Sequence, residues 1–140
     1  MAVSLRNPGS SVSVADQEAS VRSDQPAVDF QAALEAALGD RRELSIEAGL
    51  FSSEHPSMLQ RAWQAVAAKH LMGLAEAVEC LSERLMFLGA ADASRLAVAI
   101  MAPARKGDWV MVDENLRRLE TEIGRVEAFY LDLGFLHWLC

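Results

Sequence analysis

The sequence has few of the residues that a β protein or a disulfide-stabilised domain needs. Its 140 residues include eight Gly, four Pro and two Cys, and 6% are aromatic. So few turn and aromatic residues, beside abundant Ala, Leu and Glu, disfavour a sandwich or barrel and favour helices. Cys80 and Cys140 form no zinc-site spacing and no disulfide framework. We therefore expect an all-α protein in a reducing, cytoplasmic location.

Positive charge and long apolar runs are also scarce. Thirteen Lys and Arg face twenty Asp and Glu, which gives a net charge of -7 and a surface that repels phosphate backbones and anionic lipid. No window holds 18 consecutive apolar residues, and the start of the chain lacks the apolar stretch of a signal peptide. These absences predict a soluble chain with no nucleic-acid and no membrane partner.

Familiar catalytic motifs are missing. The chain has no GxSxG, HExxH, P-loop or GxGxxG pattern. His55, His70 and His137 lie in separate segments, and no two of them are four residues apart on one helix face, so we expect no metal. Cys80 has glutamates on neighbouring helix faces, which disfavours a thiolate nucleophile. We expect no cofactor and no enzymatic activity.

Three regions differ in composition. Residues 1–25 are Ser-rich, have no aromatic residue and show no helical period, which is typical of a disordered tail. Residues 26–133 carry helical apolar spacing and should form one up-and-down helical bundle with a short extra helix at its start. Residues 134–140 are too apolar to remain in water. They should either pack on the bundle or form a homodimer interface.

Local signals divide the bundle into helices. Gly39 should end a first short helix, and Leu88-Gly89 another. Pro56 marks either a fresh helix or a kink in a longer one. The irregular apolar spacing around Lys69–Gly73, with a glycine at its end, predicts a break or bend within residues 57–88. The last helix has the clearest amphipathic period. The expected core comprises Leu34, Phe51, Trp63, Val78, Leu81, Leu85, Leu96, Ile100, Leu116, Leu119, Ile123 and Val126.

The turn markers from Val28 to about Leu131 resemble those of a histidine-containing phosphotransfer (HPt) domain. Gly39-Asp40, Phe51, Pro56, Leu88-Gly89-Ala90 and Lys106-Gly107-Asp108 match that family's pattern without a gap. The resemblance implies a four-helix bundle that exchanges phosphoryl groups with receiver domains in bacterial phosphorelays. It also implies that the exposed face of the His-bearing helix, with its bundle neighbour, receives the first helix of the receiver domain.

The chain departs from the family at the phosphoacceptor. That position, about nine residues before Leu88, holds Glu79, and the following Lys and Gly positions hold Ser82 and Glu83. The nucleophilic imidazole and the nearby cation needed for an in-line phosphoryl exchange are thus missing. His70 is a weak candidate for a substitute phosphoacceptor, because Met72-Gly73 do not reproduce the Lys-Gly pair that follows the family's histidine.

The resemblance therefore implies a degenerate HPt protein for two-component signalling. It would bind a response-regulator receiver domain and modulate a phosphorelay without transferring phosphate. The partner-binding residues would be Glu76, Glu79, Cys80, Ser82 and Glu83. From pattern alone, the glutamates are also an ordinary solvated helix face. The alternatives are a helical adaptor or chaperone with no phosphorelay role, and a small enzyme using the Glu pair, for which no partner base is apparent.

Overall fold

The computed structural model describes residues 25–135, and within them the regular structure is entirely helical. The predicted tail, except for Gln25, and the last five residues of the 134–140 extension lie outside the described residues. No helix in the described part has an apolar stretch long enough to cross a bilayer. The all-α expectation is confirmed. The helices are α2 (Phe30–Ala36), α3 (Arg41–Ala68), α4 (Leu71–Phe87), α5 (Ala91–Ala99), α6 (Met101–Arg105) and α7 (Trp109–Asp132).

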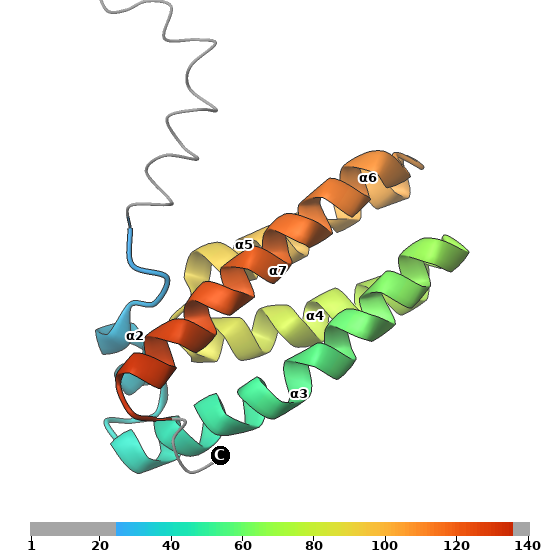
Figure 1. The fold of residues 1–140 in the computed structure, drawn as a ribbon. Coiled ribbons are helices and arrows are strands. Elements are labelled where there is room, and N and C mark those ends of the chain that lie inside the picture. The colour runs from blue at the N-terminus through green and yellow to red at the C-terminus, as the bar shows by residue number, and fades with distance from the viewer. Residues whose placement is uncertain (1–24, 136–140) are drawn as a thin grey trace, which may run out of the picture.

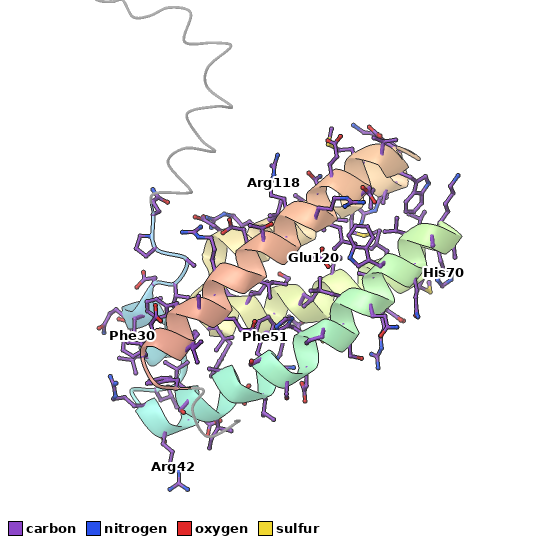
Figure 2. All side chains as sticks on the ribbon, viewed as in Figure 1. Phe30, Arg42, Phe51, His70, Arg118 and Glu120 are labelled. Atoms are coloured by element: carbon purple, nitrogen blue, oxygen red, sulfur yellow. The ribbon has the colours of Figure 1, made fainter. Side chains whose placement is uncertain are left out.

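The long helices follow one another in alternating directions (Figure 1). α4 packs against α3 and α5, whereas α7 packs against α3, α5 and α6, so α4 and α7 occupy opposite corners of the bundle. The short α2 crosses one end and touches α3 and α4. Figure 2 labels Phe30 at this end and His70 at the other.

Side chains cap the N-termini of most of these helices. The carboxylates of Asp29, Asp40 and Asp108 accept backbone N–H groups from the first turns of α2, α3 and α7, each at 3.1 Å. Such caps satisfy amides that have no partner within the helix. The predicted turn at Lys106-Gly107-Asp108 is confirmed.

The break between α3 and α4 falls within the predicted segment Lys69–Gly73, at its first two residues. Lys69 adopts a left-handed conformation with φ 54° and ends α3. The Nδ1 atom of His70 then accepts the backbone N–H of Gly73 at 3.1 Å and starts α4. Gly73 therefore belongs to the first turn of α4, where a Cβ atom would lie 2.6 Å from that nitrogen. The glycine accommodates the cap instead of breaking the helix.

α3 continues through Pro56 as one helix, which excludes the alternative of a fresh helix at this proline. The core lies between the helices, and nine of the twelve predicted core side chains are fully enclosed. Leu34, Trp63 and Leu96 are instead partly buried and pack against its edge. The indole N–H of Trp63 donates to Glu120 at 2.9 Å, so its position at the edge keeps its polar atom bonded.

The turn between α4 and α5 fixes α2 in place. Gly89 has φ 76°, and its carbonyl accepts the backbone N–H of Asp29 at 2.9 Å. A Cβ atom on Gly89 would lie 2.4 Å from the carbonyl oxygen of Asp29. Only glycine fits this approach, because both the backbone angle and the available space exclude a side chain.

Aromatic rings cover the same end of the bundle. Phe135 is buried, with its ring centroid 5.9 Å from that of Phe30 and 5.7 Å from that of Tyr130. Its carbonyl accepts the hydroxyl of Ser45 at 3.3 Å. The first apolar side chain of the predicted 134–140 extension therefore lies on the bundle.

Candidate functional site

The candidate site is the outer face of α4. Glu76, Glu79, Cys80 and Glu83 are exposed there and follow the helical period. Opposite them, the side chains of Ala77, Val78, Leu81 and Leu85 are buried against the neighbouring helices. Two stripes thus divide α4, one that holds the bundle together and one that remains available to a partner.

Ser82 lies apart from this face. Its hydroxyl is 2.7 Å from the hydroxyl of Ser94 on α5, and Ser94 also donates to the backbone carbonyl of Ser82 at 2.9 Å. Ser82 is half-buried and Ser94 fully buried. Ser82 is therefore turned toward α5, away from the exposed stripe, and its predicted part in partner binding stays a prediction. We call the four remaining residues, Glu76, Glu79, Cys80 and Glu83, the acidic face.

The acidic face carries uncompensated negative charge. Its three glutamates make no ion pair within residues 25–135. The nearest cation along the helix, Arg84, is held by Glu54 of α3 at 2.7 Å and lies over the ring of Phe51. The face therefore repels phosphate and attracts cationic groups.

A shallow hollow continues the acidic face toward α3. It has a volume of about 90 Å³ and is lined from α3 by Met58 and Arg61 and from α4 by Gly73, Glu76 and Cys80, together with Ala77. Arg61 is exposed at its edge. The α3 and α4 surfaces together offer a carboxylate, a guanidinium and a soft apolar floor, which suit protein contact better than small-molecule chemistry.

Two of the three histidines lie in the described part of the chain, where they contact neighbouring helix segments. His70 uses Nδ1 for the α4 cap, and His55 is half-buried between α3 and α7. His137 lies outside the described residues. The structure gathers no group of three or more potential metal ligands in the part of the chain it describes.

Ser52, His55 and Glu127 form a polar cluster that the sequence does not predict. A single oxygen of Glu127, Oε2, accepts the hydroxyl of Ser52 at 2.6 Å and lies 3.0 Å from Nε2 of His55. Ser52 and His55 are one turn apart on α3, whereas Glu127 comes from α7. No sequence pattern joins residues so distant. The serine hydroxyl donates to the carboxylate and not to the histidine, so the cluster lacks the serine–histidine hydrogen bond of a nucleophile with its base and links α3 to α7 instead.

Comparison with protein-family models, curated proteins and solved structures finds no match to this chain.

Proposed function

We propose that this chain is a non-catalytic HPt-like protein that binds a receiver domain and modulates a phosphorelay without transferring phosphate. The observation that carries the proposal is the state of Glu79. It lies at mid-length on α4, exposed and without an ion-pair partner in the described part of the chain. At the position where the HPt resemblance expects an exposed phosphoacceptor, the chain thus presents an exposed carboxylate.

The order of the helices supports the same proposal. A short helix is followed by the long α3, then α4 with the candidate face, the α5–α6 segment and α7. An alternating order of this kind is compatible with the four-helix bundle that the HPt resemblance implies. If the resemblance holds, the acidic face and the adjoining surface of α3 would receive the receiver domain.

The chemistry at this surface supports binding without transfer. A carboxylate at Glu79 offers no imidazole nitrogen to attack an aspartyl phosphate, and Glu83 adds a second negative charge nearby. Binding to a receiver would therefore depend on cationic and apolar groups of its docking helix rather than on its phosphoryl group.

The test is binding to a panel of purified receiver domains, measured by isothermal titration calorimetry. We expect micromolar affinity for one receiver and at least a tenfold loss for the double variant Glu79→Lys with Glu83→Lys. The matched control is Glu35→Lys with Glu114→Lys, which changes the net charge equally at exposed positions on α2 and α7. Binding to no receiver would favour the adaptor or chaperone function instead.

A second experiment tests the absence of transfer. Incubation with a phosphorylated receiver should leave the chain unmodified. Acid-labile phosphate on His55, His70 or His137 would refute the non-catalytic assignment. Restoring transfer requires more than Glu79→His, because Glu83 still repels phosphate. Adding Glu83→Gly should help, whereas Ser82→Lys would break the hydroxyl contact with Ser94 and is expected to weaken the fold.

A further inference from the structure

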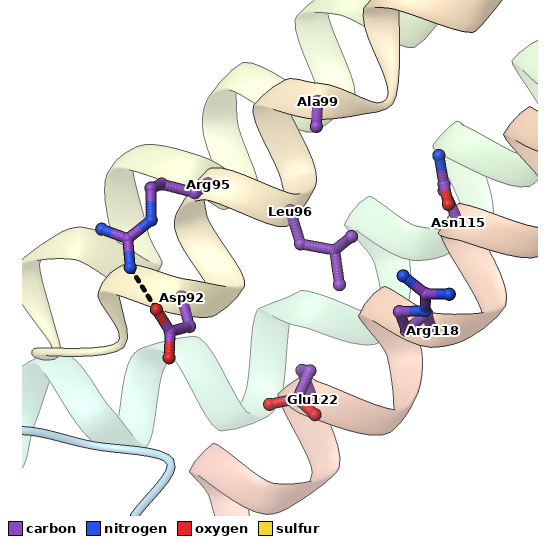
Figure 3. A pocket seen from close by; sticks show the side chains of 7 residues that line it. All are labelled: Asp92, Arg95, Leu96, Ala99, Asn115, Arg118 and Glu122. Atoms are coloured by element: carbon purple, nitrogen blue, oxygen red, sulfur yellow. Dashed lines mark hydrogen bonds and ion pairs between the residues drawn. The ribbon is translucent and has the colours of Figure 1, made fainter. Parts of the chain in front are cut away.

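A groove on the opposite side of the bundle forms a separate candidate site. It lies between α5 and α7 and has a volume of about 440 Å³ (Figure 3), within the range of small-molecule sites. One stripe of α5 supplies its first wall and one stripe of α7 its second. Because α7 and α4 occupy opposite corners, this groove is independent of the acidic face.

The floor of the groove is apolar. Leu96 projects between the two helices, and Ala99 follows one turn later on α5 (Figure 3). The small side chain of Ala99 leaves the space above it open. A ligand with a short hydrocarbon portion could bury it here.

The carboxylates of the groove already have partners. Asp92 is paired with Arg95 on α5, and Glu122 is paired with Arg125 on α7, the latter at 3.0 Å. Each pair leaves little net charge. Because both carboxylates are already paired, they leave the charge of any other cation in the groove uncompensated.

Arg118 is that further cation. It is exposed, and neither its guanidinium nor the side-chain amide of Asn115 has a hydrogen-bond partner or ion pair in the described structure. The two residues are three apart on α7, so their side chains lie on adjacent turns of one face (Figure 3). A guanidinium beside a carboxamide provides several donors for one carboxylate.

We propose that this groove binds a small organic monoanion, with its carboxylate on Arg118 and Asn115 and its hydrocarbon portion on Leu96 and Ala99. A monoanion is favoured over a polyanion such as phosphate, because the groove offers, within the described part of the chain, a single cation without an ion pair, Arg118. General attraction does not explain such binding, since the chain carries a net charge of -7. The site must depend on the local pairing of charges.

The test uses hexanoate as the probe and follows amide and methyl resonances of the full chain by NMR. We expect saturable shifts confined to the α5–α7 groove. Hexanol, which lacks the charge, and inorganic phosphate, which lacks the hydrocarbon portion, should each bind at least tenfold more weakly. Equal shifts with hexanol, or stronger binding of phosphate, would refute the assigned ligand class.

Two arginine variants locate the site. Arg118→Gln should weaken hexanoate binding about tenfold, the effect of losing one charge-assisted interaction. Arg117→Gln is the matched control, since Arg117 is the exposed neighbour whose guanidinium is paired with Asp113 at 2.8 Å and does not line the groove. Helical circular dichroism should be unchanged in both. Equal loss of binding in both variants, or no loss in either, would show that the groove is not the site.

Discussion

Tyr130 joins α7 to the end of α4 through one buried hydrogen bond, and its removal gives a clear test of the packing. Its hydroxyl donates to the carbonyl of Leu88 at 2.8 Å, where α4 ends. Both residues are almost fully enclosed. Tyr130→Phe keeps the ring and removes only the donor, so the Leu88 carbonyl is left buried without this partner. We expect a loss of about 1–3 kcal/mol in the free energy of unfolding, or roughly 5–15 °C in melting temperature.

The same hydroxyl makes the stability depend on alkaline pH. Burial raises the pKa of the Tyr130 phenol above its ordinary value. The unfolded chain therefore loses this proton first, so the stabilising contribution is complete below pH ~10 and declines above it. The stability difference between the natural chain and Tyr130→Phe should narrow by about 1.4 kcal/mol per pH unit above that point.

Urea unfolding at neutral and alkaline pH measures both effects. Tyr130 is the only tyrosine in the chain, so its ionisation can be followed directly by ultraviolet absorbance. The matched control is Thr121→Val, which removes an exposed hydroxyl that donates to a carbonyl of the same helix at 3.3 Å. Water replaces that bond, so the free energy of unfolding of Thr121→Val should differ from that of the natural chain by at most about 0.5 kcal/mol. A Tyr130→Phe chain as stable as the natural one, or equally sensitive to alkali, would refute the reasoning.

Three further variants test local features by urea unfolding. Gly89→Ala should lower the free energy of unfolding by about 3 kcal/mol, because of the positive φ of Gly89 and the close approach of Asp29. Gly107 has a similar φ but open space around it, so Gly107→Ala should lower the free energy of unfolding by about 1 kcal/mol. Equal losses in the two variants would exclude the contact with Asp29 as a cause. Glu127→Ala should lower the free energy of unfolding by about 1–3 kcal/mol, because it removes the acceptor that links α3 to α7. Glu127→Gln should lower it by less. An alanine variant as stable as the natural chain would show that the cluster does not stabilise the fold. His70→Ala should lower stability by about 1 kcal/mol, and His70→Asn should recover most of it if the cap is responsible.

Helix positions were largely predictable because their signals are local. Gly89 supplies a residue that can adopt the left-handed conformation after α4, and Asp108 supplies a carboxylate that caps the start of α7. The structure has helix boundaries at both places. The break before α4 was predicted within Lys69–Gly73, but its local cause was not, because it uses a lysine in the left-handed region and a histidine cap. Neither residue is typical of its role, whereas Gly73 carried a breaker signal that tertiary structure overrides.

The candidate site was predictable to the extent that it lies on one helix. The exposure of Glu76, Glu79 and Glu83 follows from the period of α4 alone. The burial of Ser82 does not, since it depends on how closely α5 approaches. The contacts of Glu127 with α3 depend in the same way on packing. So does the placement of Arg118 and Asn115 on α7 above a floor from α5, because only the packed bundle brings these surfaces together.

The division of α4 into a buried and an exposed stripe bears on how this protein evolves. Substitutions among Ala77, Val78, Leu81 and Leu85 change the packing and are removed by selection for folding. Substitutions on the acidic face leave the packing almost unchanged, because its side chains contact solvent. The residues of this surface can therefore change, and with them any partner that the surface binds, while the bundle persists.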